Sequence, residues 1–109
     1  MTVYLSNAFS LSMISAPTTI KVLEANTENV KDIIKDGFVS AVGHETTAQA
    51  ITSQLGVQVS FNRVSIKLVP GDVLIVFQLL ARLPEGKILS QDEMKQVAAK
   101  WYVCFVAPF

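Results

Sequence analysis

Residues 37–56 read GFVSAVGHETTAQAITSQLG, and this stretch predicts a strand followed directly by a helix. Residues 38–42 are β-prone, and Gly43 interrupts them. A helix is expected over residues 44–55, ended by a glycine, because apolar residues recur at helical spacing: Ala48, Ile51 and Leu55. His44 is then at the N-terminus of this helix, directly after a strand, and one turn before Ala48 on the same face.

Strand-like and helix-like segments alternate on both sides of this unit. Residues 72–81 form the most continuous apolar run, as expected for the centre of a sheet. Residues 57–69 alternate only loosely and end at a Pro-Gly turn. Further strands are expected at residues 3–5, 19–25 and 101–106. Two further helices are expected. One covers residues 27–36 and is capped by Thr27, and the other runs from the Ser90/Glu93 capping box to about residue 100. The fold class is α/β or α+β, as a single domain over residues 1–109 with one mixed sheet.

The bulk composition narrows the function classes. The 109 residues are 50% hydrophobic and carry nine basic and nine acidic side chains, so the net charge is zero. A protein that coats duplex nucleic acid needs a surplus of Lys and Arg, and stable duplex binding is therefore not expected. A single cysteine, Cys104, cannot form an internal disulfide and favours a reducing, intracellular setting. We see neither a signal-peptide pattern nor a membrane-spanning apolar run, and expect a cytosolic protein.

His44 is the most distinctive candidate for chemistry. The positive end of the helix dipole disfavours a protonated imidazole, whereas a phosphate bound by the backbone N–H groups at the same terminus favours it. Such a histidine could be neutral in the empty site and protonated when a phosphodiester binds, which suits a general acid. The alternative is structural: the ring simply packs over the first helical turn, as most lone histidines do.

Four other polar residues have two interpretations each. Arg63 and Arg82 follow strand-like segments, where guanidinium groups hold phosphates, but each alone is more typical of a surface ion pair or a solvated strand end. Gln78 interrupts the apolar run and either pairs inside the core or lines a pocket. Asn7, at a strand end, either lines the same site or forms a turn.

Several familiar motifs are absent from the sequence. There is no GxxxxGK[ST], GxGxxG, HExxH or GxSxG motif, and the acidic residues are scattered. With one histidine and one cysteine, the chain offers no expected metal site, and we expect no cofactor.

Segments 7–11 (NAFSL), 37–45 (GFVSAVGHE), 62–64 (NRV), 77–79 (FQL) and 82–86 (RLPEG) together resemble a known family. This family is the viral ring nucleases, or type III anti-CRISPR proteins, of crenarchaeal viruses. The resemblance covers nearly the whole chain, and the SAVGHE and RLPEG segments are the specific ones.

The resemblance implies a mixed sheet of about five strands with helices mainly on one side. It implies a homodimer inside the infected host cell that holds cyclic tetra-adenylate between its subunits and linearises it without a metal, blocking type III CRISPR signalling. A ribose 2′-hydroxyl would attack the adjacent phosphate to give di-adenylate with a 2′,3′-cyclic phosphate. The matching catalytic residues are His44, as proton donor to the leaving 5′-oxygen, Arg82 and Glu85; the matching ligand-site residues are Asn7, Ser10, Arg63 and Gln78.

Other function classes remain open from the residues alone. A non-catalytic sponge for the cyclic nucleotide would bind the ring without cutting it. A small viral regulator would bind nucleic acid or protein, and a structural virion protein would do neither. Cleavage in excess EDTA, lost in His44→Ala while binding persists, would favour the enzyme over these alternatives.

Overall fold

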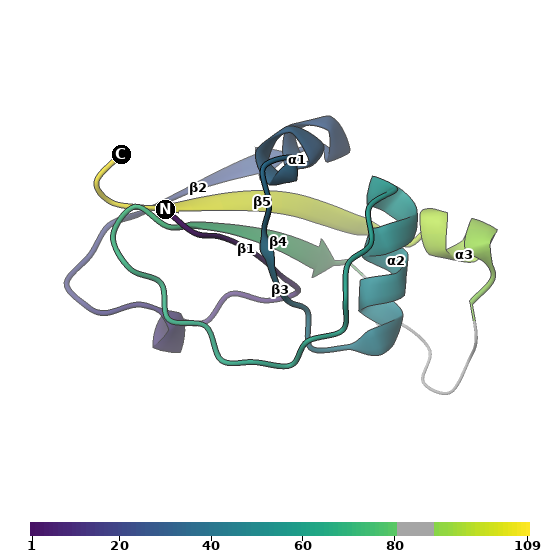
Figure 1. The fold of residues 1–109 in the computed structure, drawn as a ribbon, viewed down its shortest axis with the longest axis horizontal. Helices are drawn as coiled ribbons and strands as arrows, with labels where there is room; N and C mark the ends of the chain where they lie inside the picture. The colour runs from purple at the N-terminus through teal and green to yellow at the C-terminus, as the bar shows by residue number, and fades with distance from the viewer. Residues whose placement is uncertain (81–88) are drawn as a thin grey trace.

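The computed structural model describes residues 1–80 and 89–109, and a mixed five-stranded sheet forms its centre (Figure 1). The strand order is β2-β5-β4-β1-β3, which confirms the expected single mixed sheet. The strands are β1 (Val3–Ser6), β2 (Ile20–Ala25), β3 (Val39–Ala41), β4 (Val73–Leu79) and β5 (Ala99–Val106). The helical elements are η1 (Leu11–Met13), α1 (Thr27–Ile34), α2 (Glu45–Leu55) and α3 (Gln91–Lys95).

Strand directions determine where the loops meet. β1 lies between β4 and β3 and is parallel to both. β5 is antiparallel to β4 and to β2. Because parallel strands run the same way, the carboxyl ends of β1, β3 and β4 lie at one end of the sheet. The segments that follow these three strands therefore begin close together.

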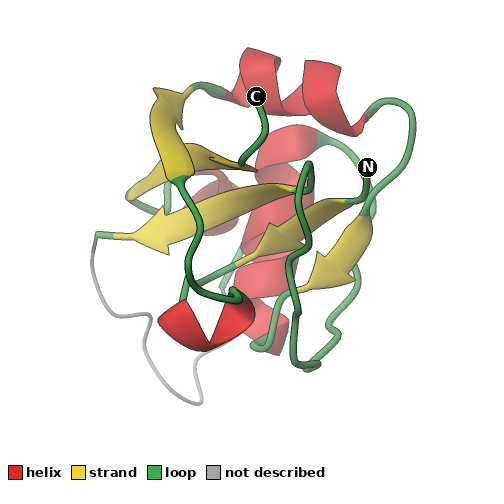
Figure 2. Cartoon of the chain, turned by 90° about the vertical axis from the view of Figure 1, so that its left-hand side faces the viewer, coloured by secondary structure: helices red, strands yellow, loops and turns green. Residues whose placement is uncertain are grey.

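The helices pack mainly on one face of the sheet, as expected. In Figure 2, α2 lies behind the strands and η1 lies in front of them. The rings of Phe77 and Trp101 meet edge to face on the helix side, with their centroids 4.8 Å apart. Most buried residues of this main core come from the sheet and from the two longer helices, among them Leu5, Ile75, Phe77, Trp101, Val103, Val30, Ile34, Ala48, Ile51 and Leu55. Burial of these side chains is the dominant stabilising term for the domain.

The opposite face of the sheet is covered by irregular segments. Residues around η1 and the segment before β4 fold across it, because apolar side chains at intervals along both segments reach the strands. This second cluster contains Ile66, Leu68, Leu74, Val76, Cys104 and Val106, with Met13 and Ile14 packed against it.

Helix boundaries differ from the expectation in α1 and in α3. α1 ends at Ile34 instead of residue 36. Asn26 rather than Thr27 caps α1, since Asn26 has an extended backbone and exchanges hydrogen bonds with Asn29 in a capping box. The Ser90/Glu93 capping box of α3 is confirmed, but α3 ends at Lys95 instead of near residue 100. The reason is that Ala99 already pairs with Leu79 in the sheet.

Candidate functional site

Several predicted site residues lie at the end of the sheet where β1, β3 and β4 finish. Asn7 directly follows β1, His44 follows β3 across two residues, and Gln78 is the penultimate residue of β4. Arg63 comes two residues after Phe61, which forms a parallel bridge to Val42. Ligands of open sheets with parallel strands bind at the carboxyl ends of those strands, so this end is the natural place for a site.

Asn7 is tied to the turn that presents His44. The side-chain Oδ1 of Asn7 accepts a 3.0 Å hydrogen bond from the backbone N–H of Gly43. The Nδ2 group of Asn7 makes no hydrogen bond to any described residue. A methyl group added at Gly43 would lie 3.6 Å from Cγ of Arg63 and 3.9 Å from Oδ1 of Asn7. Asn7 and Arg63 therefore both lie next to the residue that precedes His44.

Hydrogen bonds join the backbone leading to Arg63 to β3 and to the residue that follows it. The N–H of Asn62 donates to the carbonyl of Val42 at 2.9 Å, and its side-chain Nδ2 donates to the carbonyl of Ser40 at 2.6 Å. The hydroxyl of Ser40 in turn donates to the carbonyl of Ser60 at 2.6 Å. Arg63 itself is exposed and makes no ion pair with the described residues. A fixed backbone with an unpaired guanidinium is an arrangement that holds anions.

His44 is the N-cap of α2, with an extended backbone and no side-chain hydrogen bond to the helix. The first intrahelical bond runs from the N–H of Ala48 to the carbonyl of His44, at 2.9 Å. Within the described part of the chain, the N–H groups of Glu45, Thr46 and Thr47 have no acceptor. Free N–H groups at a helix start attract anions. The carboxylate of Glu45 also lies at the positive end of the helix dipole and competes with a bound anion for it. The positive charge of Arg63 would offset this competition.

The expectation that His44 shares the face of Ala48 is wrong. Ala48 is buried in the main core, whereas His44 is exposed. The extended backbone of an N-cap residue takes its side chain out of the helical repeat, so the imidazole does not follow the apolar face. The ring therefore does not pack into the core.

Gln78 and Ser10 are placed differently from this group. Gln78 is exposed and donates to the carbonyl of Leu79 at 3.3 Å, which excludes pairing inside the core. Ser10 caps η1 by accepting from the N–H of Ser12 at 3.3 Å, and it makes no hydrogen bond to Asn7, His44 or Arg63. The predicted Arg82 and Glu85 lie outside the described residues.

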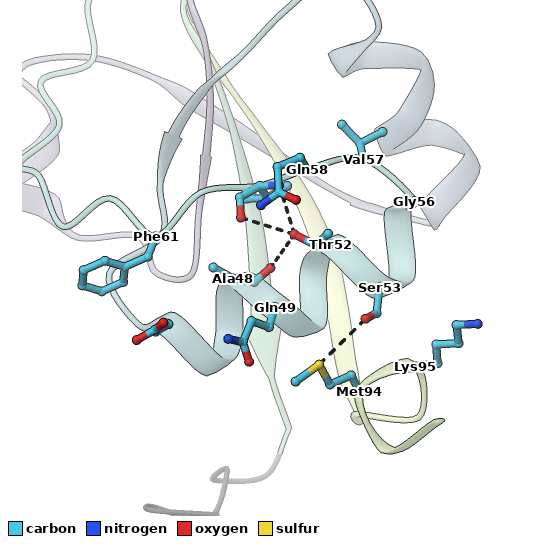
Figure 3. A pocket seen from close by; sticks show the side chains of 12 residues that line it. Ala48, Gln49, Thr52, Ser53, Gly56, Val57, Gln58, Phe61, Met94 and Lys95 are labelled. Carbon is cyan, nitrogen blue, oxygen red and sulfur yellow. Dashed lines mark hydrogen bonds between the residues drawn. The ribbon is translucent and has the colours of Figure 1, made fainter. Parts of the chain in front are cut away.

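Sequence reasoning missed the groove that begins beside His44. It has a volume of about 820 Å³ and runs along α2, from Glu45 past Gln49 to Lys95 on α3 (Figure 3). The hydroxyl of Thr52 holds one wall, because it lies 2.9 Å from the carbonyl of Ala48 and accepts a 3.0 Å bond from the N–H of Val59. The polar residues of α2 at Gln49 and Thr52 were the only sequence signal for it. Ser40 and Asn62, which position Arg63, stand in segments that carry the family resemblance but were not expected as site residues.

Among the described residues, 1–80 and 89–109, no helix has the length and apolar character needed to cross a membrane. The same residues contain no group of three or more His, Cys, Asp or Glu side chains placed to hold a metal ion.

Comparisons with known proteins agree on one family. The family model described as STIV B116-like matches residues 3–101. The chain is 38% identical over 80 residues to uncharacterized protein 26 of Sulfolobus islandicus filamentous virus, covering 72% of this chain and 68% of that protein. It is 33% identical over 103 residues to uncharacterized protein ORF117 of Acidianus two-tailed virus, covering 91% and 88%. Among solved structures, B116 of Sulfolobus turreted icosahedral virus superimposes with a TM-score of 0.82 and 31% identity, over 95% of this chain and 98% of that one.

Proposed function

The chain belongs to the STIV B116-like family, and from this premise we propose that it is a ring nuclease that cleaves cyclic tetra-adenylate without a metal ion. This membership confirms the predicted relation to proteins of crenarchaeal viruses. The observation that carries the proposal is the arrangement around His44. Among the described residues, an exposed imidazole lies at a helix start whose first N–H groups have no acceptor, and the side chain of Arg63, which makes no ion pair there, lies next to Gly43.

The proposed reaction is an internal transfer at phosphorus. A ribose 2′-oxygen bonds to the adjacent phosphorus and releases its proton to solvent, and the bond from phosphorus to the 5′-oxygen breaks. His44 donates a proton to that leaving oxygen, and Arg63 and the N–H groups at the start of α2 stabilise the negative charge on the phosphate. The products are di-adenylates that end in 2′,3′-cyclic phosphates. Arg82 and Glu85 are proposed as further catalytic residues, and Gln78 and Ser10 as ligand contacts.

We also propose that the active form is a homodimer acting inside the infected cell. A two-fold axis would place two copies of His44 across a ring of four repeating nucleotides, so each copy would make one cut. Removal of the ring would stop the type III CRISPR response that depends on it. Neutral net charge is compatible with this ligand, because four phosphates need a local group of cations rather than a basic surface.

The decisive experiment incubates labelled cyclic tetra-adenylate with the purified protein in excess EDTA. We expect conversion to di-adenylate, a loss of at least about 100-fold in rate for His44→Ala, and nearly unchanged ring affinity in that variant. Asp32→Asn, an exposed change on α1 outside the His44 end of the sheet and outside the groove along α2, is the matched control and should cut at the wild-type rate.

Two other results would each overturn the enzyme proposal, and a third would overturn its mechanism. Binding of the ring with no cleavage would identify a sponge. Salt-dependent retardation of duplex DNA with no ring binding would identify a nucleic-acid regulator. An unchanged rate in His44→Ala would remove His44 from the mechanism.

A further inference from the structure

An exposed aromatic ring lies at one end of the groove along α2. Phe61 is 52% exposed and lines this groove together with Glu45, the first residue of α2. In Figure 3 the ring of Phe61 lies at the end of the groove opposite Lys95. Phe61 also bridges to Val42, two residues before His44. The ring is therefore presented beside the end of the sheet that carries His44.

Hydrogen bonds fix the backbone on both sides of Phe61. The carbonyl of Ser60 accepts from the hydroxyl of Ser40 at 2.6 Å. The N–H of Asn62 donates to the carbonyl of Val42 at 2.9 Å. Single exposed apolar side chains are common on protein surfaces and need no functional explanation. An exposed aromatic ring on a fixed backbone differs from these, because a ligand that stacks on it does not first have to order the segment.

Beside this ring lies a carboxylate whose charge is not compensated. Glu45 is exposed, and it makes no ion pair with the described residues. The groups near it suit an anion: the first N–H groups of α2 have no described acceptor, and the side chain of Arg63 lies next to Gly43. Stabilisation of the helix dipole accounts for an acid at this position. A ligand that covers the carboxylate must nevertheless supply a hydrogen-bond donor, because a buried charge without a partner costs free energy.

An amide follows one helical turn further along α2. Gln49 is four residues after Glu45, so the two side chains begin about 5–6 Å apart on the helix surface. Gln49 is exposed, lines the same groove and makes no hydrogen bond to any described residue. Its amide can donate one hydrogen bond while the carboxylate accepts another. This end of the groove thus offers an aromatic face, an acceptor and a donor.

Adenine presents the matching groups. Its flat face stacks on aromatic side chains, and a carboxylate accepts from the exocyclic amino group of a base. A ring nitrogen next to the amino group of adenine accepts a hydrogen bond from an amide. Uracil has no exocyclic amino group and would leave the carboxylate of Glu45 unpaired. The groove volume of about 820 Å³ lies within the range of small-ligand sites, so there is space for a base.

We propose that Phe61, Glu45 and Gln49 recognise one adenine of the nucleotide that the His44 site binds. The base stacks on the ring of Phe61, its amino group donates to the carboxylate of Glu45, and a ring nitrogen accepts from the amide of Gln49. The phosphate that adjoins this base is held by Arg63 and the start of α2. The inference rests on the proposed function for the choice of adenine among amino-substituted bases, and it adds the residues that select the base.

The test compares two 2′-deoxy dinucleotides, which the proposed reaction cannot cut because they lack the attacking hydroxyl. One carries adenine, and the other carries unsubstituted purine, which lacks only the 6-amino group. By NMR titration we expect the wild type to bind the adenine dinucleotide about tenfold more tightly. Glu45→Ala should reduce this ratio to about one. Because the two ligands have equal charge, the loss of repulsion between Glu45 and phosphate does not affect the ratio.

Glu28→Ala is the matched control for that variant. It removes an exposed acid from the first turn of α1, away from the groove, and therefore changes the net charge by the same amount. It should keep the tenfold preference for adenine.

Further variants measure the contacts of Phe61 and Gln49. Phe61→Leu keeps an apolar side chain without a ring face and should weaken both dinucleotides by about tenfold, with their ratio unchanged. Phe61→Tyr keeps the ring and should bind as the wild type does. Gln49→Ala should weaken both dinucleotides by about fivefold, because unsubstituted purine retains the ring nitrogens. Thermal denaturation of each variant checks that it is folded.

Two results would each overturn the inference: equal ratios in the wild type and Glu45→Ala, or wild-type affinity of Phe61→Leu for both dinucleotides. Neither measurement depends on cleavage. If the protein fails to cut cyclic tetra-adenylate while the ratio depends on Glu45, the proposed function is wrong and the base recognition stands. If it cuts the ring while the ratio does not depend on Glu45, the base recognition is wrong and the proposed function stands.

Discussion

Asn7 and Gly43 are joined by a 3.0 Å hydrogen bond from the N–H of Gly43 to the side-chain oxygen of Asn7. The bond links the end of β1 to the turn between β3 and α2, two segments that are 36 residues apart in the sequence. It fixes the backbone just before His44. The position of the imidazole therefore depends on a residue of another strand, and we expect that dependence to be measurable.

Asn7→Ala should affect both stability and the proposed reaction. The variant leaves the partly buried N–H of Gly43 without its acceptor, which should lower the free energy of unfolding by about 1 kcal/mol. A small displacement of a catalytic group typically costs up to about 100-fold in rate, and we expect cleavage to fall accordingly. Urea denaturation and single-turnover cleavage measure the two effects.

Asn7→Asp is the matched control for that variant. It keeps an oxygen that accepts from Gly43 and should unfold near the wild-type urea concentration. It replaces the Nδ2 donor by a negative charge, so affinity for the cyclic nucleotide should fall instead. Equal loss of stability in both variants would show that the hydrogen bond is not the source of the effect.

Gly43→Ala and Gly56→Ala should differ in stability, because the backbone conformation requires glycine at position 56 but not at position 43. Gly56 ends α2 with a φ of 68°, a left-handed conformation that alanine adopts only with strain. We expect Gly56→Ala to lose about 1 kcal/mol of stability. A methyl group at Gly43 meets its neighbours no closer than 3.6 Å, so Gly43→Ala should change stability by less than about 0.5 kcal/mol. Thermal denaturation of the two variants side by side tests this contrast, and a reversed order would contradict it.

The strand and helix pattern could be predicted from local sequence because the signals are local. The apolar run of β4, the capping pair Ser90/Glu93 and the glycine after α2 each act within a few residues. Helix ends were less predictable where the sheet competes for the same residues. Ala99 and Lys100 suit a helix, yet their pairing with β4 ends the helical segment early.

The site could be predicted only in part, because the contacts that assemble it join residues far apart in the sequence. His44 at a helix start follows from the local glycine and helical spacing, and the structure confirms that position. The hydrogen bonds of Asn7 and of Asn62, the residue before Arg63, span 36 and 22 residues of sequence, and no local pattern encodes them. That Gln78 is exposed rather than paired in the core depends on where the covering segments stop, which is a property of the tertiary structure.

Asp72 should be among the most sensitive polar positions outside the site. It is 3% exposed, and its two carboxylate oxygens accept from the N–H of Thr2 at 3.0 Å and the N–H of Val69 at 2.9 Å. Asp72→Asn turns one of these acceptors into a donor that faces an N–H group. We expect a loss of about 2 kcal/mol by urea denaturation. Asp32→Asn, on the exposed face of α1, should lose less than about 0.5 kcal/mol, and similar losses in both would contradict the assigned role.

Cys104 should be unreactive in the folded protein. Its side chain is buried in the second core cluster, and burial raises the pKa of the thiol because the charged thiolate is poorly solvated there. The folded state therefore holds this proton to higher pH than the unfolded state does. Stability linked to the thiol is fully present below the pKa of the unfolded state and is lost as pH rises through the folded pKa.

Two measurements follow from the buried thiol. A chromogenic disulfide reagent should label native protein at pH 8 many times more slowly than protein in denaturant, since only the exposed thiolate reacts. In Cys104→Ala the part of the alkaline loss of stability that comes from this group should disappear, although the lost packing lowers stability at every pH. Rapid labelling of the native protein at pH 8, with its circular dichroism unchanged, would mean that Cys104 is accessible and that this face of the sheet is less tightly covered than the packing of Ile66 and Leu68 implies.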